Sequence, residues 1–80
     1  MKSINIQYYA LFRELAGKDF ESIEVPFSSY KELYEMLSAQ YKFKLPQEMI
    51  QLAVNDEFVS FDSSIVDRAK VVFIPPVAGG

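Results

Sequence analysis

The fold is decided by the stretch SYKELYEMLSAQY, residues 29–41, which predicts one long amphipathic helix. Ser29 and Glu32 fit a capping box, in which the serine hydroxyl and the glutamate carboxylate satisfy free backbone N–H groups at a helix start. Pro46 prevents the helix from continuing far beyond this stretch. Aromatic residues at helical spacing beside a sheet usually pack in a core, so we interpret the tyrosines as core residues and not as a ligand site. The apolar side chains recur at spacings of three and four on one helix face, and they are Tyr30, Leu33, Tyr34, Leu37 and Tyr41.

Two runs of alternating apolar and polar residues precede this helix. The first contains Ile4, Ile6 and Tyr8, and a period of two predicts a half-buried strand. The alternation is lost over residues 9–17, where residues 11–16 predict one helical turn or a turn-like loop that Gly17 ends. It returns from Phe20, and together the two runs predict a β-hairpin. The second run places three apolar residues on one face, Ile23, Val25 and Phe27, and the polar Ser22 and Glu24 on the other.

Three further strands are predicted after the helix. Residues 52–54 and 58–59 flank Asn55 and Asp56, two residue types that tolerate the conformations of a short hairpin turn. Residues 60–69 are polar and irregular. Residues 71–74 are apolar at every position, which predicts a central strand that is covered on both faces. One helix packed across one mixed sheet, an α+β fold, lets each of these elements bury its apolar face.

Composition limits the size and the chemistry of the protein. Eighty residues allow one domain, and a hydrophobic fraction of 50% excludes a disordered chain. The sequence has no cysteine and no histidine, which excludes disulfides, thiolate nucleophiles and most transition-metal sites, so we expect no metal. A net charge of −3 without a basic stripe argues against nucleic acid as a partner. No apolar run reaches membrane-spanning length, so we expect a cytoplasmic protein without a membrane partner. The acids, such as Asp19, Glu21 and Glu24, lack ligand spacing, and we expect them to form a solvated face.

The last six residues form a distinctive segment. Pro75 and Pro76 have a fixed φ and no N–H to donate, so they end a strand and direct the rest of the chain away from the sheet. Gly79 and Gly80 have no Cβ, so a diglycine end can lie in a narrow channel and expose its carboxyl group to attack. We therefore expect a domain of residues 1–76 and a flexible tail of residues 77–80, whose C-terminus acts as a reagent. The alternative is a frayed terminus without a function. The full segment is Pro75, Pro76, Val77, Ala78, Gly79 and Gly80.

The predicted element order, with a diglycine at its end, resembles the ubiquitin-like β-grasp fold, in which the first and last strands lie parallel at the sheet centre. Within that superfamily, three stretches are similar to the small subunit of molybdopterin synthase, the MoaD type. The last stretch is the most specific, because a bare Gly-Gly is shared with thiamine-pathway sulfur carriers and ubiquitin-related modifiers. The stretches are FRELAG at 12–17, AVNDEFV at 53–59 and FIPPVAGG at 73–80.

One segment departs from that family. Residues 67–71, DRAKV, stand where the family usually has a Gly-Asp-Glu turn, so one glycine and two acids are missing. We expect the turn to form with right-handed helical residues and the local charge to be inverted. Any partner contact that the family makes through those acids is left open.

The resemblance implies a sulfur carrier that is not an enzyme on its own. In such proteins an ATP-dependent activating enzyme, a relative of ubiquitin-activating enzymes, adenylates the terminal glycine, which is Gly80 here. A sulfur donor enzyme then displaces AMP and leaves a thiocarboxylate. The resemblance further implies that the tail enters the large subunit of molybdopterin synthase, in a heterotetramer, and gives sulfur to cyclic pyranopterin monophosphate. No bound cofactor is expected, ATP is used by the activating enzyme, and the catalytic residues are expected in the large subunit.

Strand parity predicts the partner surface. If the first strand turns its alternating apolar residues to the helix, Tyr9 points the other way, with Phe58 and Ile74 on the same open face. Arg13 is predicted nearby at the polar rim, and aromatic and arginine side chains often dominate binding energy. Each of these residues taken alone could equally be ordinary surface or core. Two other functions stay open: a sulfur carrier or protein modifier of another pathway, such as thiamine synthesis or tRNA thiolation, and an interaction domain with an irrelevant tail.

Overall fold

The main helix begins and ends as the sequence predicts. Helix α2 spans Tyr30–Tyr41, and its capping box is complete, because Glu32 N donates to Ser29 Oγ at 3.4 Å and Ser29 N donates to Glu32 Oε1 at 3.2 Å. Lys42 comes next in the left-handed conformation, with φ 62°, and ends the helix before Pro46. The predicted apolar stripe faces inward, with Tyr30, Leu33, Tyr34 and Leu37 buried and Tyr41 half-buried.

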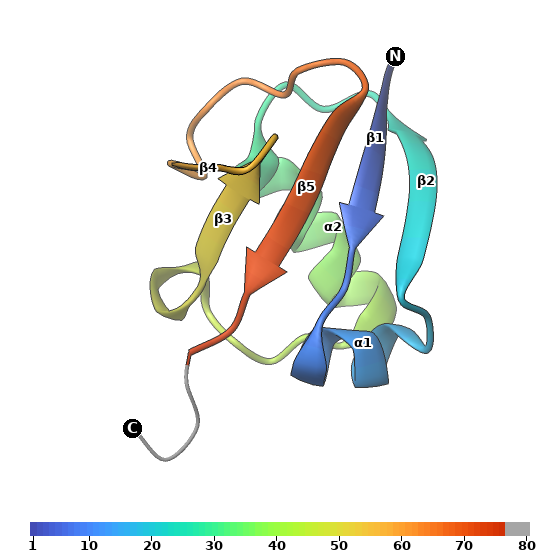
Figure 1. Cartoon of the computed structure of the whole chain (residues 1–80), viewed down its shortest axis with the longest axis vertical. Helices are drawn as coiled ribbons and strands as arrows, with labels where there is room; N and C mark the ends of the chain where they lie inside the picture. The colour runs from blue at the N-terminus through green and yellow to red at the C-terminus, as the bar shows by residue number, and fades with distance from the viewer. Residues whose placement is uncertain (77–80) are drawn as a thin grey trace.

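The computed structural model describes residues 1–76, and these form one five-stranded sheet with α2 behind it (Figure 1). The strand order is β2-β1-β5-β3-β4, in which β1 and β5 are parallel neighbours at the centre and the other pairs are antiparallel. This arrangement confirms the predicted α+β class and the ubiquitin-like β-grasp topology. The strands are β1 (Lys2–Gln7), β2 (Phe20–Val25), β3 (Gln51–Val54), β4 (Glu57–Val59) and β5 (Ala69–Ile74).

Two short helices complete the fold. Helix α1 (Ala10–Ala16) is longer than the single turn that the sequence predicts, and Gly17 ends it with φ 75°, a conformation that favours glycine. Figure 1 places α1 at the end of the sheet where β1 and β5 end. A 3-10 helix, η1 (Gln47–Met49), precedes β3 and was not predicted.

The core is an aromatic cluster between α2 and the sheet. Phe12 of α1 lies with its ring centroid 4.8 Å from that of Phe43, and Tyr34 of α2 lies 5.3 Å from Phe73 of β5. The generous number of aromatic residues in so short a chain is thereby largely used in packing. Because such rings each bury a large apolar area and pair edge to face, they supply much of the stability of a small domain.

Strand β5 corrects one prediction. The sequence predicts that residues 71–74 are covered on both faces, but α2 covers only one face of the sheet in the described part of the chain (Figure 1). Val71 and Phe73 are fully buried against the helix side, whereas Val72 and Ile74 are only half-buried on the other side. A run that is apolar at every position therefore reflects an apolar open face and not a second covering layer.

The turn before β5 corrects another prediction. Arg68 has φ 65°, in the left-handed region, and not the right-handed helical conformation that was expected. Ala69 N donates to Val66 O at 3.2 Å across the turn, and Asp67 Oδ1 accepts from Ser3 N at 2.8 Å. These bonds hold Arg68 in a conformation that costs a residue with a Cβ about 1–2 kcal/mol. The two hairpin residues behave as predicted, with φ 51° at Asn55 and 70° at Asp56.

Candidate functional site

A row of side chains crosses all five strands on the sheet face opposite α2. Directly paired residues point to the same face of a sheet, and the register pairs each member of the row with the next. Phe58 and Phe20, at the two edges, are 70% and 54% exposed, and the residues between them are half-buried. We call this surface the open face. From β4 to β2 the row is Phe58, Ala53, Val72, Gln7 and Phe20.

The open face has an apolar half and a polar half. On the apolar side of the row, β5 ends at the half-buried Ile74, from which the chain continues through Pro75. On the polar side, Ser22 Oγ donates to Asn5 Oδ1 at 2.6 Å, and Lys70 pairs with Asp56 at 3.1 Å. The apolar half therefore lies at the end of the sheet where the chain leaves β5, and the polar half lies at the opposite end of the sheet.

The structure brings together two of the four predicted interface residues. Phe58 and Ile74 share the open face, as strand parity predicts. Arg13 lies within α1, and Tyr9, which is 48% exposed, is the extended N-cap residue that precedes this helix. Arg13 Nε lies 3.6 Å from Asp19 Oδ1 in an exposed ion pair. These two residues therefore lie at the end of the sheet, where the chain passes from β1 into α1 (Figure 1).

The predicted tail is only partly described. Pro75 and Pro76 come directly after β5 and belong to no strand, as predicted from their missing N–H groups. The predicted reactive residue Gly80 and the predicted tail residues Val77, Ala78 and Gly79 lie outside the described residues.

Sequence reasoning missed the two other large apolar residues of the row, Phe20 and Val72. Phe20 has the same parity as Ser22 and Glu24, which were correctly placed on the polar side of β2, so the same alternation would have found it. Val72 belongs to a run that is apolar at every position, so alternation does not show which face of the sheet it points to. Only the register with Gln7 and Ala53 assigns it to the open face.

Glu21 corrects the prediction that the acids form a solvated face. The register pairs it with Ile6 on the side of α2, where its carboxylate accepts hydrogen bonds from the hydroxyls of Tyr8 at 2.5 Å and Tyr41 at 2.8 Å. Lys18 Nζ lies 3.5 Å from the same carboxylate. Burial, and then the bond to Glu21, raises the pKa of the Tyr8 hydroxyl far above its ordinary value. The cluster ties the start of β2 to the end of α2, while Asp19 and Glu24 are exposed as predicted.

Metal-binding clusters and membrane-spanning helices are both absent from residues 1–76. No group of three or more His, Cys, Asp or Glu residues in this part of the chain could hold a metal ion. No helix within the same range is long and apolar enough to cross a membrane.

Known proteins resemble this chain over nearly its full length. Residues 6–80 match the model of a family described as the ThiS family. The molybdopterin synthase sulfur carrier subunit of Escherichia coli (strain K12) is 34% identical over 80 residues, which cover 96% of this chain and 99% of that protein. A Pyrococcus furiosus structure, described as subunit 1 of a molybdopterin converting factor, has a TM-score of 0.82 and 32% identity, covering 96% of this chain and 100% of that one. A further solved structure is the complex of subunits 1 and 2 of the molybdopterin-converting factor from Helicobacter pylori 26695. Its matching chain has a TM-score of 0.68 and 19% identity, covering 98% of this chain and 99% of that one, which shows a shared fold.

Proposed function

This chain belongs to the ThiS family, and from that membership we propose that it is the sulfur carrier subunit of a molybdopterin synthase. The name and the 34% identity of the Escherichia coli subunit support the proposal. One structural observation carries it: the apolar half of the open face ends at Ile74, from which the chain continues through Pro75 and Pro76. A partner that covers this half of the face stands next to the point from which residues 77–80 continue.

The proposed chemistry takes place at the carboxyl group of Gly80. An α-carboxyl has an ordinary pKa of about 3.5, so at neutral pH it is an anion whose carbon is a poor electrophile. In the proposed sequence, a carboxylate oxygen attacks the α-phosphate of ATP on an activating enzyme, which releases pyrophosphate and forms an acyl adenylate. A hydrosulfide ion supplied by the donor enzyme then attacks the carbonyl carbon through its sulfur and gives up its proton to solvent. AMP leaves with the electron pair of the broken C–O bond, and a thiocarboxylate remains on Gly80.

The groups that catalyse sulfur transfer are proposed to belong to the partner. The sequence has no cysteine and no histidine, so it offers neither a thiol nor an imidazole for this work. We place the catalytic groups in the large subunit, which receives the thiocarboxylate beside cyclic pyranopterin monophosphate. ATP is consumed by the activating enzyme, and this chain itself needs no bound cofactor.

The open face is proposed to bind the large subunit. The complex of subunits 1 and 2 of the Helicobacter pylori factor, whose matching chain shares this fold, supports such a pairing. Phe58 and Ile74 supply exposed apolar area on the open face, and such area on a small domain commonly marks a partner site. Tyr9 and Arg13, at the start of α1 and within it, are proposed as further anchors at the end of the sheet where β5 ends. We propose a heterotetramer of two carriers and two large subunits.

A reconstituted reaction tests this function. The purified chain, prepared with a C-terminal thiocarboxylate, is mixed with the large subunit of a molybdopterin synthase and cyclic pyranopterin monophosphate, and the dithiolene product is measured. We expect product from the thiocarboxylated chain and none from the same chain with an ordinary carboxylate. The Escherichia coli carrier subunit serves as the positive control. If that control gives product and this chain does not, the assignment to molybdopterin synthesis is wrong, and transfer to a thiazole precursor or to tRNA becomes the better hypothesis.

A further inference from the structure

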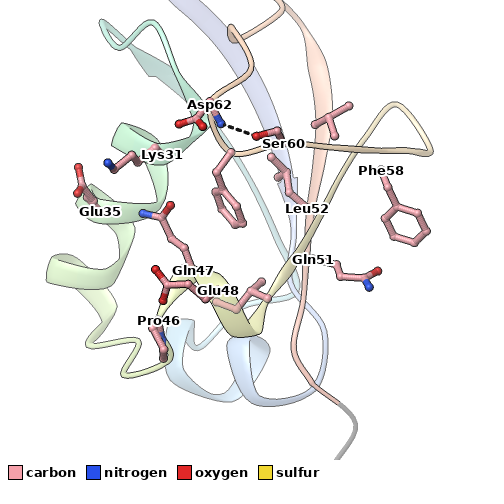
Figure 2. Close-up of a pocket in the computed structure, with 13 residues that line it drawn as sticks. Lys31, Glu35, Pro46, Gln47, Glu48, Gln51, Leu52, Phe58, Ser60 and Asp62 are labelled. Atoms are coloured by element: carbon pink, nitrogen blue, oxygen red, sulfur yellow. Dashed lines mark hydrogen bonds between the residues drawn. The ribbon is translucent and has the colours of Figure 1, made fainter.

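A groove of about 790 Å³ lies between α2, η1 and strands β3 and β4, mainly on the helix side of the sheet (Figure 2). Figure 2 shows Lys31 and Glu35 on α2 and Glu48 on η1 across the groove from β3. Two of its apolar lining residues are buried, at 7% and 2% exposure, and two are half-buried. These four residues are Ile50, Leu52, Val59 and Phe61, and the exposed Pro46 and Phe58 also line the groove.

The charged side chains around the groove are mostly acidic. Glu35 of α2, Glu48 of η1 and Asp62 after β4 are all exposed, and Lys31 is the cation among the lining residues. None of the three carboxylates forms an ion pair with another residue of the described range 1–76. An apolar lining under a negative rim is complementary to a ligand that combines apolar and cationic groups.

Strand β4 adds a hydrogen-bonding edge to the groove. Among residues 1–76 it pairs only with β3, through a hairpin whose two turn residues, Asn55 and Asp56, both have positive φ. In such a hairpin the residues that flank the turn, Val54 and Glu57, exchange hydrogen bonds, and the next pair along does not. The backbone N–H and C=O of Phe58 therefore point away from β3. An extended peptide can pair with an edge of this kind.

We propose that this edge and groove bind an extended basic segment of a partner protein, which adds a strand beside β4. Alternate side chains of the added strand point to the helix side, where lysine or arginine meets Glu35, Glu48 and Asp62. The aliphatic stems of these lysine or arginine side chains pack on Leu52 and Val59, and the residues between them point to the other face of the sheet. The groove and the open face share Phe58, so the added strand and the large subunit would meet at this residue. The binding involves no tail chemistry, and its failure would leave the proposed sulfur-carrier function untouched.

A nuclear magnetic resonance titration of the full chain, labelled with nitrogen-15, tests the site. The probes are two end-blocked peptides, Lys-Val-Lys-Val-Lys-Val-Lys and Glu-Val-Glu-Val-Glu-Val-Glu. We expect the basic peptide to shift amide signals in residues 31–35, 47–52 and 57–62, with a response that falls as salt is raised. An equal response to the acidic peptide, shifts centred on β1 and β2, or no response to the basic peptide would overturn the proposal.

Two matched double variants test the charges that we assign to the groove. Glu35→Gln with Glu48→Gln should weaken the basic peptide about 5-fold, since exposed ion pairs contribute modestly. The control is Glu14→Gln with Glu24→Gln, two exposed acids away from the groove. It makes the same change in net charge and should leave the affinity for the basic peptide unchanged. Equal effects of the two double variants would overturn the assigned charges.

Phe58→Pro removes the outward N–H at an edge position that tolerates proline, and it should abolish binding that Phe58→Ala retains. Equal affinities of these two variants, both with unfolding transitions like the parent, would overturn the strand addition. If Phe58→Pro does not fold, the peptide pair and the charge pair still decide the proposal.

Discussion

Replacing Phe58 with aspartate should break the proposed complex with the large subunit while leaving the domain folded. Phe58 is 70% exposed and lies on the edge strand β4, so its side chain contributes little to the core. Aspartate is disfavoured in strands, and the loss of stability should stay within about 1 kcal/mol. The variant should therefore unfold in a cooperative transition close to that of the parent.

The effect on binding depends on the area that Phe58 exposes. A phenylalanine side chain offers roughly 200 Å², so an exposed fraction of 70% leaves about 140 Å² for a partner to cover. At about 25 cal/mol per Å², losing this burial costs about 3.5 kcal/mol, and an unpaired carboxylate in the interface costs several more. The dissociation constant should rise at least about 1000-fold.

Titration calorimetry with the purified large subunit checks this value. The matched control is Val66→Asp, because Val66 is 53% exposed but lies in the loop before β5, away from the apolar half of the open face. We expect the control to bind like the parent. If Phe58→Asp is folded and its affinity lies within about threefold of the parent, the open face is not the interface and the area argument fails.

Three further predictions concern stability. Leu37→Ala, at a side chain that is 1% exposed in α2, should lose about 2–5 kcal/mol in urea unfolding; a midpoint close to the parent would mean that the stripe does not pack as described. Arg68→Gly should gain about 0.5 kcal/mol, because glycine relieves the left-handed strain at φ 65° but adds unfolded-state entropy; a loss greater than about 1 kcal/mol would contradict this. Burial and Glu21 raise the pKa of Tyr8 in the folded state, so its contribution to stability is complete below about pH 10, the ordinary tyrosine value, and declines as pH rises above it. Unfolding midpoints between about pH 8 and 11 should show a smaller decline in Tyr8→Phe than in Tyr9→Phe, a change at an exposed tyrosine, and equal declines would refute the assignment.

Local patterns in the sequence predicted most elements of the fold. The capping box at Ser29 and Glu32, the stripe of α2 and the turn at Asn55 and Asp56 all depend on residues that are close in the chain, so periodicity and turn chemistry suffice. The parallel pairing of β1 and β5 joins distant segments, and it was available only through the family resemblance.

The errors share a physical cause, which is that they depend on register or on long-range contacts. Glu21 has the parity of Ile23 and Val25, so alternation places it on the core side, but only its long-range bonds to Tyr8 and Tyr41 show how a carboxylate is accommodated there. Arg68 is held in the left-handed region by a turn whose residues Asp67 and Arg68 form hydrogen bonds with Ser3, near the other end of the chain. For the proposed site, parity correctly placed Phe58 on the open face, whereas Arg13 belongs to α1, to which strand parity does not apply.

The central claim, that Gly80 carries sulfur on its carboxyl group, is tested most directly by intact-mass spectrometry. The purified chain is incubated with the activating enzyme, ATP and a sulfur donor, beside variants that lack Gly80, carry Gly79→Ala or have one residue added after Gly80. Removing Gly80 moves the terminal carboxyl by roughly 3.5 Å, and a misplacement of even ~1 Å can cost ~100-fold in rate. A gain in mass that matches replacement of one oxygen by sulfur is predicted for the parent, and it should be absent in the shortened and extended chains and reduced in Gly79→Ala. The same gain in the chain without Gly80, or no gain in the parent when the Escherichia coli subunit is converted under the same conditions, would contradict the claim.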